Sequence, residues 1–455
     1  MSETAAFTIR GVIEGFYGTP WPQEERLAMI RFLERHGYNA YFYAPKDDPY
    51  LRERWQEPHP TMQLANIVRL AEEAREGQLD FYYCLSPGLD MRYSSEEDFS
   101  IMLEKFRQMF SAGIRHFGLF FDDIPMTLLH EDDQQRYDSL ASAHADVTLR
   151  LWEQLQSWSE ENRLVICPTL YNGLGNEPYI VDLGRFLPQE IMIFWTGRFV
   201  CSPYLTEGDA AKFVEWTGHR PLYWDNYPVN DLAMANELHI GPLVHRDPDL
   251  YRHAHGYVAN AMELVESSKI PLITTGHYLL HPESYDPEKS WQQAIKEIAG
   301  EQDAEAFLRF ADNVRSSFLN EQESPRLLEL FLRFRSQFLR GDQKVAVSAV
   351  KKLFREMEET AIYLLHRMEN KKLANEVYRW VEKYRRWAKV GQATALMVDS
   401  GIRGRTPLAV FYLLLLKYRL WRAEKMPQRV CGSVMRLFVD AILQEVKVKR
   451  EKSRK

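Results

Sequence analysis

The sequence contains few cysteines and no long apolar run. Its four cysteines, Cys84, Cys167, Cys201 and Cys431, are far apart and form no CxxC pair. This argues against a zinc knuckle or a disulfide scaffold and favours reduced thiols. The longest apolar run covers residues 408–416, about half of the ~20 residues that a membrane helix needs. We therefore expect no membrane partner.

Basic side chains are in the minority. The chain of 455 residues has 57 lysines and arginines, 64 acidic side chains and a formal net charge of -7, which argues against a nucleic-acid partner. Its first residues show no basic segment followed by an apolar stretch, so we expect no secretory signal and a cytoplasmic protein. A phosphate-binding loop and a GxSxG elbow are missing as well. Hydrophobic residues, at 45%, and aromatic residues, at 13%, suffice for a large buried core.

The first part of the chain, residues 1–295, alternates short apolar runs with segments of helical periodicity, which is typical of a parallel sheet covered by helices. The expected strands are Phe7–Ile13, Asn39–Tyr43, Phe81–Leu85, His116–Phe121, Arg163–Cys167, Ile191–Trp195, Pro221–Trp224 and Gly256–Ala259. The expected helices include Gln23–His36, Gln63–Arg75, Glu96–Ala112, Ser139–Ser159 and Glu207–Thr217. Eight strands, each followed by a crossover, predict an α/β fold, a (β/α)8 barrel of the TIM type. A doubly wound open sheet is the alternative, but no glycine fingerprint follows the first strand.

The second part, residues 296–455, has apolar residues at three- and four-residue steps and no strand pattern. The expected helices are Asp303–Phe318, Leu327–Leu339, Val345–Met368, Leu373–Val390, Leu408–Ala423 and Val430–Val446. They predict an all-α helical bundle domain of five or six helices. The aromatic residues expected in its core are Trp380, Trp387, Phe411 and Trp421. Residues 447–455 carry six basic side chains, and we expect a solvated terminus, with a docking tail for an anionic partner as the alternative.

Two adjacent carboxylates follow the fourth expected strand. In a barrel enzyme the chemistry lies at the C-terminal ends of the strands, and Asp122 and Asp123 come directly after apolar residues 117–121. Two carboxyl groups crowded in a partly dry pocket acquire different pKa values, so one can stay ionised while the other keeps its proton. Glycoside hydrolysis needs that division of labour. A helix N-cap and a metal-binding pair are the alternative interpretations.

A metal site is the main competing hypothesis. The histidines that could supply nitrogen ligands are His116, His219, His239, His245, His253 and His255. Of these, His253 and His255 have a plausible spacing. They lie mostly off the expected strand ends, however, and no HxxEH-type pattern accompanies them. We therefore predict neither a metal nor another cofactor.

The other residues that follow the expected strands suit a sugar. The aromatic side chains that could stack on a pyranose ring or enclose it are Trp224, Tyr171 and Trp195. The side chains that could bind its hydroxyls are Asn226, Asp231, Asn260 and Lys46. A largely apolar pocket with a few placed polar groups is typical of small-molecule sites. Each residue alone could equally pack or cap a loop, and both tryptophans are consistent with the barrel wall.

Eight motifs in order along the expected barrel resemble those of glycoside hydrolase family 84, the protein O-GlcNAcases and related β-N-acetylglucosaminidases. They are EGFYGTPW (Glu14–Trp21), YAPKDDPY (Tyr43–Tyr50), SPGLD (Ser86–Asp90), LFFDDI (Leu119–Ile124), CPTLY (Cys167–Tyr171), WTG (Trp195–Gly197), WDNYPVND (Trp224–Asp231) and GYVAN (Gly256–Asn260). The helical part is similar to the stalk that follows the barrel in this family. Two departures, Thr19 in place of a common arginine and Leu232 in place of an aromatic residue, would alter the rim.

The resemblance implies a retaining, substrate-assisted mechanism. The acetamido oxygen of the substrate would attack the anomeric carbon and form an oxazoline in place of a glycosyl-enzyme ester. Matched onto this chain, Asp122 would hold the acetamido N–H, and Asp123 would act as general acid and then as base. An ionised Asp122 would raise the proton affinity of Asp123 and keep it protonated.

The resemblance also assigns sugar-binding roles to eight residues. Those expected around the acetamido group are Tyr171 (a donor to its oxygen), Asn226, and the pocket walls Thr196 and Trp224. Those expected at the other oxygens are Gly15 and Lys46 (O3) and Asp231 and Asn260 (O4 and O6). The implied partner is a GlcNAc-bearing protein or oligosaccharide, and the sequence indicates no oligomeric state. A catalytically silent GlcNAc-binding module and a scaffold protein are the alternatives.

Overall fold

The computed structural model describes residues 5–452, with the side chains of residues 5–444. By its internal contacts the chain divides into two compact units. The first comprises Met1–Leu232, Leu243–Val265 and Leu272–Pro287; the second comprises Ala233–Pro242, Glu266–Pro271 and Glu288–Lys455. The basic segment 447–455 has its side chains outside the described residues, so the predicted tail is not tested.

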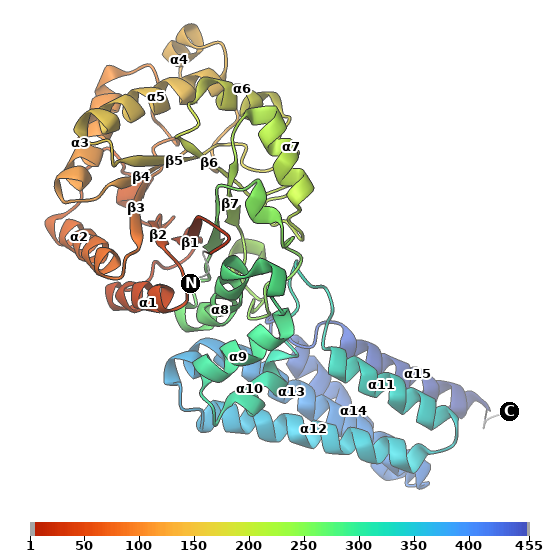
Figure 1. Cartoon of the computed structure of the whole chain (residues 1–455). Helices are drawn as coiled ribbons and strands as arrows, with labels where there is room; N and C mark the ends of the chain where they lie inside the picture. Colours follow the sequence, from red (N-terminus) through yellow and green to blue (C-terminus); the bar gives the residue numbers. More distant parts are fainter. Residues whose placement is uncertain (1–4, 453–455) are drawn as a thin grey trace. The chain divides into compact units, whose positions relative to one another are not determined.

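The first unit is built on a closed parallel barrel of eight strands, and this confirms the predicted fold class (Figure 1). The strands are β1 (Ile9–Glu14), β2 (Ala40–Tyr43), β3 (Asp80–Leu85), β4 (His116–Phe120), β5 (Arg163–Cys167), β6 (Met192–Trp195), β7 (Pro221–Asp225) and β8 (Gly256–Asn260). Each strand pairs with the next along the chain, and β8 closes on β1, with Ile13 opposite Asn260. The carboxyl ends of all eight strands therefore meet at one rim.

Helices connect the strands and ring the barrel (Figure 1). They are α1 (Gln23–Arg35), α2 (Thr61–Glu76), α3 (Glu96–Ser111), α4 (Glu131–Arg136), α5 (Leu140–Trp158), α6 (Pro178–Phe186), α7 (Glu207–Thr217) and α8 (Val265–Leu280). The starts of α3, α5 and α7 are fixed by Ser95, Ser139 and Thr206, whose side chains accept backbone N–H groups of the first turn. Because helices cover the outside and side chains fill the inside, most strands are buried on both faces.

Interlocking aromatic rings fill the barrel interior. The ring of Phe194 lies 5.5 Å from that of Phe42, 5.8 Å from that of Phe120 and 5.2 Å from that of Trp224, measured between centroids. These rings belong to a continuous apolar core that also contains Ile13. The interior is therefore packed, as in other barrels of this type, and a ligand can reach only its rim.

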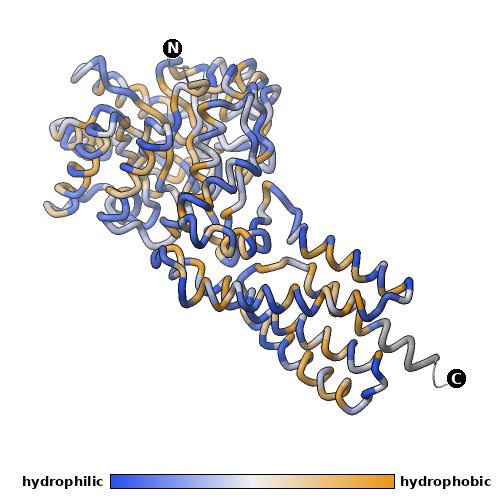
Figure 2. The backbone as a smooth tube through the Cα atoms, turned by 60° about the horizontal axis from the view of Figure 1, so that its bottom comes forward, coloured by the Kyte–Doolittle hydropathy of each residue, from blue (hydrophilic) through white to orange (hydrophobic). Residues whose placement is uncertain are grey.

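The second unit is helical. Its helices are α9 (Pro287–Ala299), α10 (Ala304–Ala311), α11 (Pro325–Leu339), α12 (Gln343–His366), α13 (Lys371–Ile402), α14 (Thr406–Glu424) and α15 (Val434–Lys452). Figure 2 shows polar and apolar residues alternating along several of them, as amphipathic helices do. Helix α10 ends seven residues earlier than predicted. The carbonyl of Asn313 accepts the amide of Cys431 at 2.7 Å instead of continuing the helix.

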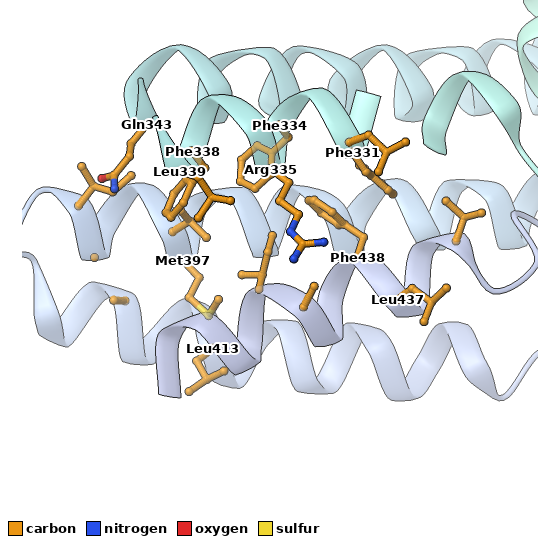
Figure 3. Close-up of a pocket in the computed structure, with 18 of the residues that line it drawn as sticks. Phe331, Phe334, Arg335, Phe338, Leu339, Gln343, Met397, Leu413, Leu437 and Phe438 are labelled. Carbon is orange, nitrogen blue, oxygen red and sulfur yellow. The ribbon is translucent and has the colours of Figure 1, made fainter. Parts of the chain in front are cut away.

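The predicted aromatic core of this unit is right in α13 and wrong in α14. Trp380 and Trp387 are buried, whereas Phe411 is 57% exposed and Trp421 is 52% exposed. Helix α14 carries apolar residues around most of its circumference, so its periodicity could not indicate which face would be covered. A cavity of about 800 Å³ lies between α11, α13, α14 and α15, lined by aromatic and aliphatic side chains such as Phe334 and Met397 (Figure 3). No helix within residues 5–452 combines the length and apolarity that a bilayer span demands.

Candidate active site

A chain of contacts links the ten residues to which the family resemblance assigned a role. Lys46 joins Asp122 to Trp224, Trp224 joins Asn226, and Asn226 joins Asn260 and through it Gly15. Tyr171 joins Asp123 to Thr196, while Asp231 reaches Asp123 through Tyr17. The contributing residues lie at or after the carboxyl ends of seven different strands, β1, β2 and β4 to β8, and meet at one rim. The structure thus brings the predicted residues together in one cluster.

Asp122 is a buried carboxylate with one oxygen satisfied. The side chain is 4% exposed, and its Oδ2 forms a short ion pair with the Lys46 ammonium group. The other oxygen, Oδ1, is buried and has no hydrogen-bond partner among the described residues. Because an unsatisfied buried acceptor is costly, Oδ1 is suited to receive a donor from a ligand.

Asp123 lies at the exposed mouth of the site and is held by two phenols. Tyr17 Oη donates to its Oδ2 at 2.6 Å, and Tyr171 Oη donates to its Oδ1 at 2.8 Å. Partial burial raises the pKa of this carboxyl, but the Lys46 charge, the two phenols and Arg52 together hold it below its usual value. These donors favour the carboxylate, whereas the mechanism that the resemblance implies needs a protonated Asp123 as the aglycone departs, and that expectation stays a prediction.

Gly15, Trp224 and Lys46 pack tightly at the centre of the site. A Cβ on Gly15 would lie 2.5 Å from the Trp224 ring, so only glycine fits there. The same ring contacts the barrel core on one side and has the Lys46 Nζ 5.5 Å from its centroid. Trp224 is thus both barrel wall and part of the site, two interpretations that the sequence left open.

An amide pair crosses from β7 to β8. Asn226 Oδ1 accepts the indole N–H of Trp224 at 2.9 Å and the amide of Asn260 at 3.0 Å. Asn260 Oδ1 in turn accepts the Gly15 backbone N–H at 3.2 Å. Asp231 Oδ2 accepts the backbone N–H of Tyr17 at 2.8 Å, and its burial raises the pKa of that carboxyl. The network fixes the orientation of both amides.

Thr196 supports Tyr171 through the backbone. Its N–H donates to the Tyr171 carbonyl at 2.8 Å, and its hydroxyl donates to the Phe199 carbonyl at 2.7 Å. Thr196 is 4% exposed. The Thr196 hydroxyl is therefore bonded within its own loop. Its backbone N–H holds the main chain of Tyr171 and so helps to position that side chain.

Four residues around the site received no role from the sequence. Tyr17 and Arg52 contact the carboxylate pair, Arg52 through the backbone carbonyls. Asp225, between Trp224 and Asn226, pairs with Arg246 through two bonds of 2.8 Å. Tyr17 lies within the GFYG motif, which could have indicated it. Nothing in the sequence pattern connects the distant Arg246 with Asp225.

Two other sequence hypotheses concern residues away from the site. Trp195 is barrel wall and no sugar platform, since it is 1% exposed and its ring lies 4.7 Å from that of Phe213 in α7. His253 faces Glu207 at 2.9 Å, and His219 faces the carbonyls of Gly184 and Leu187 at 3.1 Å. Among the described residues, no group of three or more His, Cys, Asp and Glu side chains is placed to hold a metal ion.

Comparison with known proteins adds independent information. The family profile described as beta-N-acetylglucosaminidase matches residues 10–312, and one described as bacterial GH84, post-catalytic domain, matches residues 324–408. Protein O-GlcNAcase of Rattus norvegicus and that of Mus musculus are each 32% identical over 256 residues. That stretch is 55% of this chain but only 27% of each relative, so the chain matches about a quarter of their length.

Solved structures resemble the whole chain. A mutant of the O-GlcNAc hydrolase of Thermobaculum terrenum has a TM-score of 0.94 and 35% identity, covering 98% of this chain and 97% of its own. The structure of CpGH84B has a TM-score of 0.86 and 28% identity, covering 96% of this chain and 77% of its own.

Proposed function

The chain belongs to the β-N-acetylglucosaminidases of glycoside hydrolase family 84, and from this premise we propose that it removes terminal β-linked GlcNAc with retention, by substrate-assisted catalysis. The observation that carries the proposal is the unpaired, buried Oδ1 of Asp122 beside Asp123. An acetamido N–H is a donor that this oxygen lacks. A simple glucoside, with a hydroxyl in that position, offers no amide oxygen to act as nucleophile.

In the first step the acetamido oxygen attacks the anomeric carbon while the bond to the aglycone breaks. Positive charge develops on the acetamido nitrogen, and the ionised Asp122 stabilises it through the N–H bond. The Lys46 ammonium group pairs with the other oxygen of Asp122, Oδ2, and holds the carboxylate in place. The resulting oxazoline ring consists of substrate atoms only, so no covalent bond to the enzyme forms.

Asp123 supplies the proton that the departing oxygen takes. The donors around Asp123 favour its carboxylate, so substrate binding has to change the environment of that carboxyl. Tyr171 has a single phenolic O–H, and it donates this in a hydrogen bond to Asp123 Oδ1. If that proton turns to the acetamido oxygen, Asp123 loses a donor and its pKa rises. Binding of the sugar thereby favours the protonated form of Asp123, which the first step requires.

In the second step Asp123, now a carboxylate, takes a proton from water. The water oxygen attacks the anomeric carbon from the side that the aglycone left, and the bond to the acetamido oxygen breaks. The acetamide is restored, and the anomeric configuration is retained. A single carboxylate serves both steps because protonation alternates between them.

The remaining cluster residues hold the sugar. The Gly15 carbonyl and Lys46 are proposed to contact O3, and Asp231 and Asn260 to contact O4 and O6. Trp224 and Thr196 enclose the acetamido methyl, with Asn226 beside it. The carboxylate and amide of Asp231 and Asn260 are anchored by backbone N–H groups of the segment after β1, which pre-organises them for hydroxyls.

The proposed substrate is a GlcNAc-bearing glycoconjugate, protein or oligosaccharide, and no step requires a cofactor. The cytoplasmic location, the absence of nucleic-acid and membrane partners, and the domain limits 1–295 and 296–455 stay predictions.

The proposal is tested by comparing aryl β-GlcNAc, β-GalNAc and β-glucoside as substrates. We expect turnover of the GlcNAc substrate, strongly reduced by Asp122→Asn, and none of the glucoside. Binding of GlcNAc without hydrolysis would instead indicate a catalytically silent binding module, and equal turnover of the glucoside would exclude a role for the acetamide.

A further inference from the structure

Arg52 is a buried cation whose guanidinium faces main-chain oxygens. It follows the short 3-10 helix η1 (Pro49–Leu51) in the loop after β2 and is 8% exposed. Both of its terminal nitrogens lie 3.5 Å from the carbonyl oxygen of Asp122, and Nη2 lies 3.2 Å from that of Asp123. Burying a guanidinium costs free energy, and here its hydrogen bonds within the described residues go to backbone oxygens. Because this burial is unfavourable, we expect the bound backbone to have a feature that the guanidinium stabilises.

The backbone at Asp123 is unusual. Its φ is 55°, in the left-handed region, which costs a residue with a side chain about 1–2 kcal/mol relative to the right-handed form. The two carbonyls that Arg52 binds belong to the peptide units at the Asp122–Asp123 turn, one of them on each side of the Asp123 Cα. Donation to both units at once fixes their planes. It therefore stabilises the turn that sends the Asp123 carboxyl toward Tyr17 and Tyr171.

The side chain of Asp122 has a support of its own. Its carboxylate is held by Lys46, from the loop after β2, independently of the carbonyl that Arg52 binds. Loss of the guanidinium therefore disturbs Asp123 more than the carboxylate of Asp122. Loss of the Arg52 guanidinium should therefore impair proton donation by Asp123 more than orientation of the acetamide by Asp122.

We propose, on the basis of the function proposed above, that Arg52 is a positioning residue for the general acid. Its guanidinium holds the Asp122–Asp123 turn in the left-handed conformation that directs the Asp123 carboxyl at the departing oxygen. The hydrogen bonds of Arg52 go to the backbone carbonyls of Asp122 and Asp123, so it positions the acid through the main chain, in addition to the effect of its charge on the Asp123 carboxyl.

The test uses Arg52→Met, which keeps the length of the side chain and removes its donors, and Arg52→Lys, which keeps the charge. A buried cation replaced by an apolar side chain of similar volume is often tolerated, and no carboxylate is left unpaired. The control is Arg115→Met. Arg115 also donates to two backbone carbonyls, those of Phe110 and Ile114, each at 2.9 Å, but in the segment before β4.

The measurement is kcat/KM for aryl β-N-acetylglucosaminides whose leaving groups range from dinitrophenolate to phenolate. A misplaced acid matters most where the departing oxygen needs its proton. We expect Arg52→Met to lose about 10²-fold on the phenyl substrate, with a much smaller loss on the dinitrophenyl substrate. Arg52→Lys should recover part of the loss, and Arg115→Met should leave the leaving-group dependence unchanged.

A loss by Arg52→Met that is the same for every leaving group would overturn the proposal, as would full activity. If Arg52→Met shows no cooperative thermal unfolding, Arg52→Lys decides by the same leaving-group criterion. The wild-type protein separates this result from the proposed function. A wild type that hydrolyses no β-GlcNAc contradicts the function, whereas an active wild type with a uniform loss in the variants contradicts the positioning role alone.

Discussion

Removing the Tyr17 hydroxyl should make Asp123 a weaker acid. Tyr17 Oη donates to Asp123 Oδ2 at 2.6 Å, and this bond favours the carboxylate. In Tyr17→Phe the carboxylate loses that donor, so the pKa of Asp123 rises and the protonated acid persists to higher pH. Tyr17 can keep this bond while Tyr171 turns to a ligand, so the shift applies to the free enzyme and to the complex.

The magnitude follows from the exposure of the carboxylate. A hydrogen bond to a charged group contributes about 1.5–3 kcal/mol, and we take the lower end because Asp123 is open to water that can replace the phenol. At about 1.4 kcal/mol for each pKa unit, the shift is roughly one unit upward.

The assay is the pH dependence of kcat and kcat/KM with an aryl β-GlcNAc. We expect the basic limb of both profiles to move upward by about one pH unit in Tyr17→Phe. Tyr137→Phe is the matched control, because the Tyr137 phenol donates to Asp146 at 2.7 Å away from the site, and its profile should stay unchanged. A basic limb that stays in place, or moves to lower pH, would refute this reasoning about the acid.

Three further predictions follow from the same geometry. Asp122→Asn should lower kcat on the order of 10²–10³-fold, because the charge opposite the developing cation is lost, and steady-state kinetics would show it; unchanged kcat contradicts the role. Binding of a GlcNAc-type inhibitor should take up protons, as the pKa of Asp123 rises when Tyr171 leaves it, and calorimetry in buffers of different ionisation enthalpy measures this; Tyr171→Phe should reduce the uptake. Gly15→Ala should destabilise the fold by about 1–3 kcal/mol in denaturant unfolding, since its Cβ would meet Trp224, whereas Gly208→Ala, with open space around the Cβ, should be neutral or stabilising.

The barrel was predictable from the sequence because its strands are short and almost wholly apolar. β5, for example, has the bounds that the sequence predicted, Arg163–Cys167, and its residues after Arg163 are all apolar and buried. The short helices α4 and α6 were not expected. Helix α4 is a short acidic segment between β4 and α5, and α6 is a nine-residue crossover helix between β5 and β6, so both are too short for helical periodicity to stand out. The elements that could be predicted from the sequence were therefore those long enough, or buried on enough faces, to give a clear apolar pattern.

The candidate site was predictable in its membership but not in its electrostatics. Strand order brings the loops to one rim, so residues such as Asp122 and Asn260 could be grouped before any geometry was known. The left-handed φ of Asp123 and the phenols that donate to it depend on loop conformation. A sequence pattern carries no information on which way a phenol points, so the donors that favour the carboxylate of Asp123 could not be predicted.

The central claim is that the substrate's own amide is the nucleophile. It is tested most directly by kcat/KM for aryl β-glucosaminides whose N-acyl group carries zero, one, two or three fluorine atoms. Each fluorine withdraws electrons from the acyl oxygen, so the account predicts a steep, progressive fall in rate along the series. A rate that is indifferent to fluorination would contradict it, because the acetamide would then take no part in the bond-breaking step.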